Sequence, residues 1–310
     1  MDKLSIVVPC YNEEECVELF YQTASEILKS MPVEPEFLFV DDGSSDGTCA
    51  ILRRLAKNDT RVRYISFSRN FGKEAALYAG LCGATGDLVA VMDADLQDPP
   101  ELLLEMYRGI REEQYDCVGC RRSTRKNEPK IRSLFSKFFY KLINSMTDTK
   151  IVDGARDFRM MTRQMVDAVL SLRETERFSK ELFSWVGFKT KWLEYENIER
   201  AKGSTKWSFK KLARYAVGGI ESASCAPLKV NLLFCVLCFL VCVGFVIADI
   251  VIAAAAGSVS WLFILLPVLF LLAAMLFFGL YMQGEYVKKI FYQVRGRPMF
   301  IVKEDEKSVR

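Results

Sequence analysis

Strand-length apolar segments alternate with helical apolar patterns along the first hundred residues of the chain. The first segment is apolar along nearly its whole length, as expected for a parallel strand that is buried on both faces. After it, apolar residues recur at helical spacing from Val17 to Met31. The alternation of strand and helix repeats four times and predicts a doubly wound α/β sheet. The expected strands are residues 4–9, 37–40, 62–67 and 88–92, and the later helices include residues 49–56 and 73–84.

Polar loops follow three of the four expected strands. These loops are residues 11–13, 41–46 and 93–98. Ligands of doubly wound sheets bind beyond the carboxyl ends of the strands, so we expect the three loops to share one edge. One loop of this kind is more simply a solvated turn, but three on one edge favour a nucleotide site. Asn12 and Glu15 also have the spacing of a helix-capping box.

The third loop carries the pattern that is most typical of a metal site. Asp93 and Asp95 flank one small residue at a strand end, where two carboxylate oxygens can converge on one hard cation. Mg²⁺ or Mn²⁺ suits such ligands and keeps its remaining positions for water and phosphate. Gln97 and Asp98 add polar atoms beside the pair. The chain has no glycine-rich phosphate-binding sequence of the usual kinds, so metal and basic side chains are expected to hold the phosphates.

The composition excludes several kinds of chemistry. The chain has 310 residues, a net charge of +3 and no histidine. Histidine is therefore excluded as catalytic base, nucleophile or metal ligand, and the small net charge gives no case for a nucleic acid partner. The ten cysteines are scattered, which favours buried thiols in a reducing compartment over a disulfide framework. The chain enters its first strand directly, so we expect no signal peptide.

Two later segments combine an apolar face with basic side chains. Between residues 130 and 147, apolar residues recur on one helical face, and four lysine or arginine side chains lie on the same segment. Such a helix is typical of a membrane interface, and equally of a helix that packs on a protein core. Residues 207–221 are a second candidate for an interfacial helix. The basic loop between residues 199 and 207 is either a cover for a phosphate or a solvated linker.

Two long segments near the C-terminal end are almost free of charge. Residues 230–256 and 261–281 are each long enough to cross a hydrocarbon core, which needs about 20 apolar residues. Their outer flanks are basic and the short turn between them is not, which predicts a hairpin with both ends in the cytoplasm. This reading gives a catalytic domain at residues 1–225, a transmembrane hairpin at 226–290 and a cytoplasmic tail at 291–310. The predicted hairpin also favours the membrane interface over a protein core as the location of the two amphipathic segments.

The polar motifs together resemble family 2 glycosyltransferases, and most closely those that act on polyprenyl phosphates. That group includes the bactoprenol glucosyltransferases and the dolichol-phosphate mannose synthases. Shorter matches at residues 157–159, 185–188 and 206–207 extend the resemblance beyond residue 200. The main motifs are residues 7–13 (VVPCYNE), 40–48 (VDDGSSDGT), 68–74 (SRNFGKE) and 93–101 (DADLQDPPE). The fold that the resemblance implies is of the GT-A type.

The resemblance implies roles for side chains on the nucleotide side of the site. A basic loop is expected to close on the donor phosphates, with Arg200 for the nucleotide and Lys206 as a catalytic residue. The base and ribose are expected to be held by Pro9, Tyr11, Glu13 and Asp42.

It also implies a metal, a sugar pocket and an acceptor site. Mg²⁺ or Mn²⁺ is expected on Asp93, Asp95 and Gln97, with the two aspartates counted as catalytic. Lys73 and Asp157 are expected to line the sugar pocket, and Asp157 to be catalytic. The residues expected to receive the lipid phosphate are Arg121, Arg132 and Ser136.

The expected reaction is an inverting, metal-dependent transfer of a hexose from a nucleotide sugar, with UDP-glucose preferred, to undecaprenyl phosphate. The acceptor oxygen is already anionic at neutral pH, so it needs positioning more than a strong base, in agreement with the absence of histidine. Asp157 is therefore expected to orient the acceptor or the sugar rather than to act as a base. The metal and the basic groups stabilise charge on the leaving diphosphate.

Several alternatives stay open from the sequence. GDP-mannose or a UDP-amino sugar is an alternative donor for the same acceptor, and a non-catalytic membrane anchor is a less favoured reading. A processive polysaccharide synthase is disfavoured because the chain has neither the additional spans for a channel nor a Q-x-x-R-W motif, and a transporter because there are two spans with one charge between them. We expect the partners to be the donor, the lipid and the bilayer, with self-association into a homo-oligomer. The expected location is the bacterial inner membrane, with the catalytic domain in the cytoplasm.

Overall fold

The computed structural model describes residues 1–122, 152, 154–175, 177–195 and 262–306, together with isolated helical positions between 236 and 254. The chain divides into two compact units, one formed by Met1–Gly219 with Pro298–Arg310 and the other by Ile220–Arg297. The predicted interfacial helices at 130–147 and 207–221, and most of the first apolar segment, lie outside the described residues. The three-domain division therefore stays a prediction.

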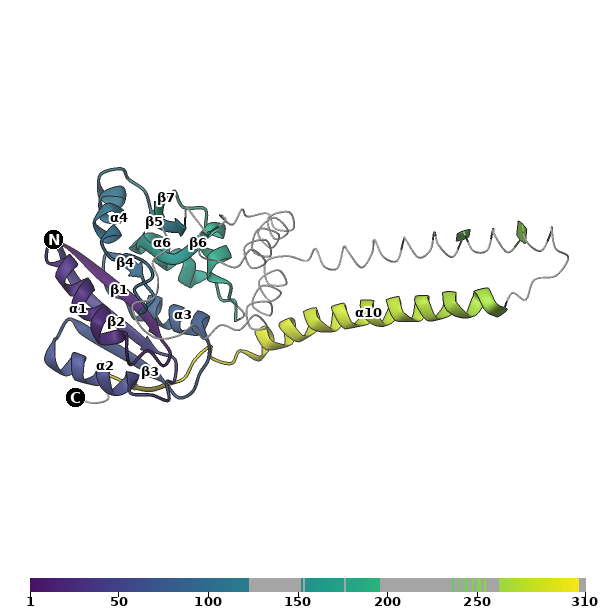
Figure 1. The fold of residues 1–310 in the computed structure, drawn as a ribbon, viewed down its shortest axis with the longest axis horizontal. Helices are drawn as coiled ribbons and strands as arrows, with labels where there is room; N and C mark the ends of the chain where they lie inside the picture. Colours follow the sequence, from purple (N-terminus) through teal and green to yellow (C-terminus); the bar gives the residue numbers. More distant parts are fainter. Residues whose placement is uncertain are drawn as a thin grey trace. The chain divides into compact units, whose positions relative to one another are not determined.

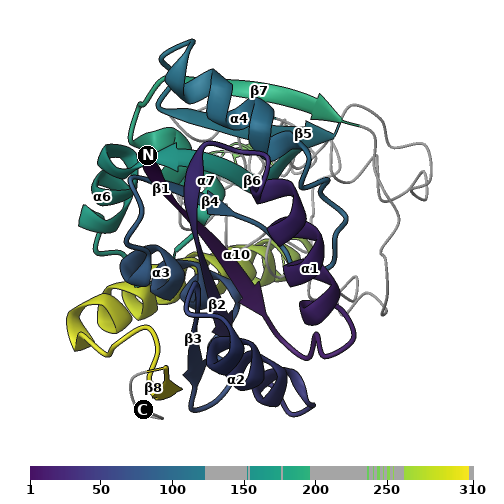
Figure 2. The same cartoon turned by 90° about the vertical axis from the view of Figure 1, so that its left-hand side faces the viewer.

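The first unit is built on one sheet, whose described part has eight strands in the order β7-β5-β6-β4-β1-β2-β3-β8 (Figure 2). The first four strands are parallel and confirm the predicted alternation: β1 (Asp2–Cys10), β2 (Val33–Asp41), β3 (Val62–Phe67) and β4 (Leu88–Val91). The sheet is mixed, because β6 runs antiparallel to β4 and β5, and β8 runs antiparallel to β3. The remaining strands are β5 (Cys117–Arg122), β6 (Ala155–Thr162), β7 (Thr190–Tyr195) and β8 (Val302–Asp305).

Helices cover both faces of the sheet, as the doubly wound prediction requires. Alternate residues of β1 point to opposite faces, with Ile6 in one apolar cluster and Val7 in the other. The first cluster packs against α1 (Val17–Leu28), α2 (Thr48–Asn58) and α4 (Leu102–Arg111). The second packs against α3 (Lys73–Gly83), α6 (Arg163–Ser171) and α7 (Ser179–Trp185). Figure 1 labels α3 and α6, and Figure 2 also labels α7.

The predicted capping box at the start of the first helix is wrong. The residue that precedes α1 is Cys16, and no side chain caps the helix there. Asn12 instead has a φ of 52°, a left-handed conformation that asparagine tolerates, and its Oδ1 accepts a hydrogen bond from the Ser45 N–H at 2.8 Å. The side chain therefore joins two loops of the site rather than a helix end.

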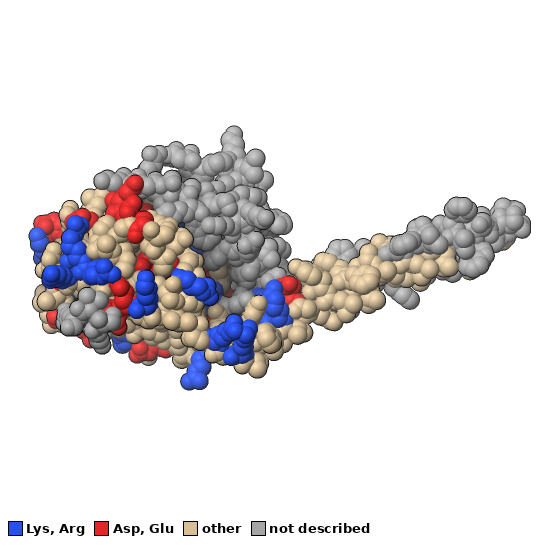
Figure 3. Space-filling model, turned by 90° about the horizontal axis from the view of Figure 1, so that it is seen from below, with Lys and Arg blue, Asp and Glu red and all other residues tan. Residues whose placement is uncertain are grey.

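The second unit contains α10 (Leu262–Arg295), which includes most of the second apolar segment. Figure 3 shows that charged side chains on this helix gather toward its C-terminal part, where Lys288 and Glu285 form an ion pair. Among the residues that the structure describes, no helix is both long and apolar enough to span a membrane.

Part of the predicted tail is folded. Residues 302–305 form β8, which pairs with β3 and closes one edge of the sheet in the first unit. At the other end of the sheet, Cys117 and Cys120 are buried free thiols of β5, in agreement with cysteines used as small apolar side chains.

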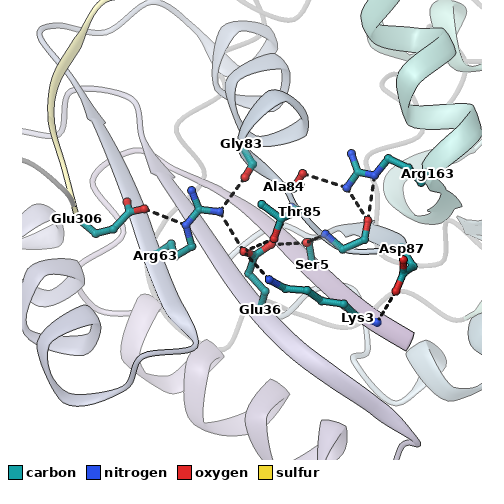
Figure 4. A network of polar contacts seen from close by, with 11 residues as sticks. Lys3, Ser5, Glu36, Arg63, Gly83, Ala84, Thr85, Asp87, Arg163 and Glu306 are labelled. Atoms are coloured by element: carbon teal, nitrogen blue, oxygen red, sulfur yellow. Dashed lines mark hydrogen bonds and ion pairs between the residues drawn. The ribbon is translucent and has the colours of Figure 1, made fainter. Parts of the chain in front are cut away.

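A buried carboxylate, Glu36 of β2, links β1, β3 and the end of α3 (Figure 4). It accepts hydrogen bonds from Ser5 Oγ, from the Thr85 N–H at 3.0 Å and from the Thr85 hydroxyl at 2.8 Å. Arg63 Nη1 donates to it at 3.0 Å, and Lys3 Nζ lies 3.4 Å away. Burial acts to raise the pKa of Glu36, but these donors together lower it to about 2.

We predict a pH-dependent loss of stability in Glu36→Gln. The lowered pKa means that ionised Glu36 stabilises the fold at neutral pH, and a shift of this size corresponds to about 3 kcal/mol. The loss should be complete above the unfolded-state pKa of 4.5 and should shrink as the pH falls toward the folded-state pKa of about 2. Denaturant unfolding of the full-length protein in detergent between pH 7 and pH 3 measures it. The exposed Glu34 of the same strand provides the control, Glu34→Gln, which should change little at any pH.

Candidate active site

The three polar loops meet at one edge of the sheet, as predicted. β1 lies between β2 and β4 and runs parallel to both, so the loops after all three strands leave from the same edge. Tyr11 and Glu13 follow β1, Asp42 follows β2, and Asp93 and Asp95 follow β4. The fold therefore brings together the residues that the sequence assigned to the nucleotide and the metal.

The loops after β1 and β2 hold each other through polar contacts. The Glu13 N–H donates to Thr48 Oγ1 at 2.8 Å, and the Gly47 N–H donates to Glu14 Oε2 at 2.7 Å. The Asn12 N–H donates to Ser44 Oγ at 2.8 Å. These contacts fix the backbone beside Tyr11, whose ring stays 39% exposed at the mouth of the site. An exposed, positioned aromatic ring offers a stacking surface for a base.

Asp42 is a buried carboxylate whose described partners are backbone N–H groups. It accepts from the Phe71 N–H at 2.6 Å and from the Gly72 N–H at 2.9 Å. Burial raises the pKa of Asp42 to about 6, although these two hydrogen bonds lower it, and the neighbouring Asp41 raises it further. Asp41 itself accepts from Ser66 Oγ at 2.7 Å and from the Ser44 N–H at 3.0 Å. Ligand hydroxyl or N–H donors would favour the ionised form of Asp42.

Lys73 bridges two carboxylates that come from different halves of the sheet. Its Nζ lies 2.7 Å from Asp93 and 2.6 Å from Asp157. β4 pairs antiparallel with β6 in a register that sets Val91 opposite Arg159, and continuing this register sets Asp93 opposite Asp157. Lys73 is the first residue of α3, which delivers its side chain to the same point. The two residues expected in the sugar pocket therefore contact each other and a residue expected to bind the metal.

The lysine keeps Asp157 ionised. Burial acts to lower the pKa of Lys73, but the charges of Asp157 and Asp93 outweigh it and raise the pKa. Burial acts to raise the pKa of Asp157, yet Lys73, with Lys180 and Arg159, brings it far below its usual range. A carboxylate with such a low pKa is a poor proton acceptor at neutral pH. The geometry therefore agrees with an orienting role for Asp157 rather than with base catalysis.

Asp95 is 5% exposed and accepts a hydrogen bond from the Gln97 N–H at 3.1 Å across the turn at Leu96, which has a φ of 55°. Within the described ranges, no group of three or more histidine, cysteine or acidic side chains could hold a metal ion. Asp93 and Asp95 nevertheless form a donor set of hard oxygens, and Mg²⁺ or Mn²⁺ takes further ligands from phosphate and water. The residues present fit a divalent cation that is shared with a bound diphosphate.

A second buried carboxylate, Asp98, was not among the predicted site residues. It is 2% exposed, accepts from Arg156 Nε at 3.1 Å and is hydrogen-bonded by the Tyr195 hydroxyl. Arg156 precedes Asp157 on β6, and Tyr195 ends β7 immediately before the segment that contains Arg200. Asp98 thus ties the loop after β4 to β6 and to the end of β7. Its place in the acidic loop was a usable signal, but nothing in the sequence marked Tyr195.

Arg159 is a buried side chain that packs beside Arg156 and Asp157 on β6. It is 2% exposed, lies 4.0 Å from the centre of the Phe183 ring, and donates to the Arg156 carbonyl at 2.9 Å. Arg121, expected to receive the lipid phosphate, forms an ion pair with Glu194 of β7. The structure therefore gives Arg121 a protein partner that the sequence did not indicate. Arg132, Ser136, Arg200 and Lys206 lie outside the described residues, and their roles stay predictions.

An α/β sheet with an acidic, lysine-bridged site at the carboxyl ends of its parallel strands has the organisation of a nucleotide-binding enzyme. Residues 5–170 match the family described as Glycosyl transferase family 2. The chain belongs to this family and is a glycosyltransferase.

Similar proteins match this chain along nearly its whole length. The CsbB protein of Bacillus subtilis is 40% identical over 97% of this chain and 91% of its own. The SfII prophage-derived bactoprenol glucosyl transferase of Shigella flexneri is 37% identical over 99% of both chains. Among solved structures, a mannosyltransferase from Pyrobaculum calidifontis in complex with GDP-Man and Mn²⁺ is 17% identical, with a TM-score of 0.46 over 94% of this chain and 85% of that one.

We predict that Lys73→Met destabilises the fold by leaving two facing carboxylates without their cation. The expected loss is about 2–3 kcal/mol, because removing one member of a largely buried ion pair leaves its partners uncompensated. Adding Asp157→Asn to Lys73→Met should restore about 1 kcal/mol, since it removes one of the two like charges. Thermal unfolding of the full-length variants measures both effects. Lys57→Met, on the exposed side of α2, is the matched control and should change stability little; an equal loss there would contradict the bridge.

Proposed function

We propose that this glycosyltransferase transfers glucose from UDP-glucose to undecaprenyl phosphate with inversion at the anomeric carbon. The observation that carries the proposal is the lysine-bridged acidic cluster of Lys73, Asp93 and Asp157, where α3 begins beside the end of β4 and β6. The choice of donor and acceptor is supported by relatives named bactoprenol glucosyl transferase, one of which is 37% identical over 99% of this chain. The product is a lipid-phosphate-linked sugar for modification of a cell-envelope glycan.

The nucleotide would lie over the loops after β1 and β2. Tyr11 offers an exposed ring to the base, and Pro9 and Glu13 belong to the same strand end. The raised pKa of Asp42 supports a role in ribose or base binding, because a hydroxyl or N–H donor from the ligand would stabilise its ionised form. Arg200 and Lys206, in the loop that follows Tyr195, would contribute positive charge to the donor phosphates.

The chemistry of the ligands supports a divalent cation on Asp93, Asp95 and Gln97. The two aspartates lie two residues apart directly after β4, and their carboxylate oxygens are the hard ligands that Mg²⁺ or Mn²⁺ prefers. Asp98 is not counted among them, because Arg156 and Tyr195 already hold it. Bound Mg²⁺ or Mn²⁺ would stabilise the leaving diphosphate.

The chain's own residues would orient the reactants rather than move a proton. The phosphate oxygen of the acceptor would attack the anomeric carbon in line, and the bond from that carbon to the diphosphate oxygen would break to release UDP. The chain has no histidine, and the lowered pKa of Asp157 disfavours it as a base. Lys73 and Asp157 would bind sugar hydroxyls, and the positive groups near the diphosphate would favour its departure.

We further propose that the two apolar segments anchor the enzyme in the inner membrane as a hairpin and that the segment at 130–147 lies at the interface. The support is the near absence of charge in residues 230–256 and 261–281, with basic residues on the outer flanks. Such an anchor would hold the catalytic domain on the cytoplasmic face, where the lipid headgroup is reached. Arg132 and Ser136 are one helical turn apart in the expected helix and could bind the same phosphate.

The proposal is tested by supplying full-length protein in detergent with undecaprenyl phosphate and radiolabelled UDP-glucose, UDP-N-acetylglucosamine or GDP-mannose. We expect label from UDP-glucose in the lipid, loss of transfer in EDTA and recovery with Mg²⁺ or Mn²⁺. Asp95→Asn should fold but react at least about 100-fold more slowly. Asp167→Asn, an exposed change on α6, should keep its activity. Before extraction, the activity should stay with washed membranes.

Three outcomes would contradict separate parts of this proposal. Full activity in EDTA would contradict the requirement for a metal ion. Transfer from GDP-mannose alone would contradict the choice of UDP-glucose as donor. Release of the activity from membranes by a carbonate wash would contradict the membrane anchor.

We also predict that Arg132→Ala impairs use of the lipid phosphate. Losing a charge-assisted hydrogen bond costs about 1.5–3 kcal/mol, so the Michaelis constant for undecaprenyl phosphate should rise roughly tenfold to a hundredfold. The affinity for UDP-glucose, measured without lipid, should hardly change. Lys141→Ala on the same expected helix controls for a general loss of positive charge and should have a small effect. An effect of Arg132→Ala on donor affinity alone would place the acceptor site elsewhere.

A further inference from the structure

The segment that follows α10 in the sequence is built into the catalytic sheet next to one wall of the site. β8 pairs antiparallel with β3, with Val302 opposite Phe67, and the Ser68 N–H donates to the Ile301 carbonyl at 2.9 Å. Ion pairs hold the far end of the segment, from Arg53 to Glu304 at 2.7 Å and from Arg63 to Glu306 at 2.9 Å. The segment is therefore attached at the point where β3 ends and the loop of residues 68–72 begins.

Phe300 packs on the last residue of β3 and on α3 through aromatic contacts. Its ring is stacked on Phe67, with centroids 4.9 Å apart, and Phe67 meets the edge of Phe71 at 5.8 Å. Phe300 also contacts Tyr78 of α3 at 6.4 Å. The same small apolar cluster includes alanines of the first two turns of α3. A side chain from the end of the chain thus completes the packing around the start of α3.

The loop that Phe300 supports carries groups of the donor site. The N–H groups of Phe71 and Gly72 are the donors that hold Asp42, and the next residue is Lys73. On its other side the loop lies against Gly43, where an added Cβ would come within 2.4 Å of the Arg69 backbone. The loop is thus confined between the end of β2 and the aromatic stack.

We propose that Phe300 is a positioning residue for the nucleotide-sugar site. By holding Phe67, which in turn contacts Phe71, it keeps the loop of residues 68–72 where its N–H groups meet Asp42 and where α3 delivers Lys73 to Asp93 and Asp157. The competing view is that Phe300 and β8 only cover the exposed edge of β3. The role in donor binding rests on the function proposed above, whereas the effect on the loop does not.

The test compares Phe300→Ala, Phe300→Leu and Phe300→Tyr with the full-length wild type in detergent. In Phe300→Ala, hydrogen exchange of the amides in residues 68–76 should accelerate about tenfold, because the loop loses its stacked support. The dissociation constant for UDP-glucose, measured without lipid, should rise about tenfold, while the Michaelis constant for undecaprenyl phosphate should stay within about twofold. In Phe300→Leu, the exchange rate and the dissociation constant should lie between those of Phe300→Ala and the wild type. Phe300→Tyr keeps the ring and should resemble the wild type in both.

Phe37→Leu is the matched control. Phe37 also stacks on an aromatic neighbour, Phe39, but it lies in the middle of β2, four residues before Asp41, where the strand ends. This variant should lower the thermal midpoint without changing donor affinity or the exchange of residues 68–76. The proposal is overturned if Phe300→Ala lowers stability as Phe37→Leu does but leaves the exchange of residues 68–76 unchanged. If the wild type does not bind UDP-glucose, the donor assignment fails while the exchange comparison still decides the positioning role.

Discussion

One protonated lysine between two carboxylates joins the two halves of the sheet at the site. Lys73 comes from α3 on the parallel half, Asp157 belongs to the antiparallel strand β6, and Asp93 follows β4 between them. Without a cation, two carboxylates so placed repel each other. The lysine therefore decides whether the ends of β4 and β6 can lie together, and it holds the pKa of Asp157 far below its usual range. The roles proposed for the metal, the sugar and the acceptor all depend on this ion pair.

The buried carboxylates of the site differ in how far the protein alone satisfies them. Asp98 has Arg156 and Tyr195, and Asp157 has Lys73, so burial of these two is compensated. Asp42 has backbone donors, yet burial still raises its pKa to about 6. A carboxylate held at such a cost to stability is typical of a binding position, because a ligand can supply the missing donors. Of these three carboxylates, Asp42 therefore has the most to gain from donors that a ligand supplies.

The sequence predicted the elements that have a periodic apolar pattern and the loops that follow them. It missed a very short strand and the contacts between residues far apart in the chain. Four buried strands and their helices follow from apolar patterning, and the shared edge of Asp42 and Asp93 follows from the polarity of a parallel sheet. β8 was missed because four residues carry too little pattern to be distinguished from a tail. The contact between Asp98 and Tyr195 spans 97 positions, and the pairing of Arg121 with Glu194 spans 73, so only the folded sheet brings them together. Asn12 was assigned to a helix cap because the sequence does not show which loop competes for its side chain.

The electrostatics of the site restrict the kind of acceptor that it can serve. A sugar hydroxyl must lose a proton as it attacks, which calls for a base with a pKa near neutral pH. This chain has no histidine, and the pKa of Asp157, the acid proposed to bind the sugar, is held far below that range by Lys73 together with Lys180 and Arg159. Removing Lys73 would raise the pKa of Asp157, but it would also release Asp93 from the cluster. Asp157 therefore cannot become a base without loss of the ion pair that holds Asp93. Such a site favours an acceptor that arrives already ionised, such as a lipid phosphate.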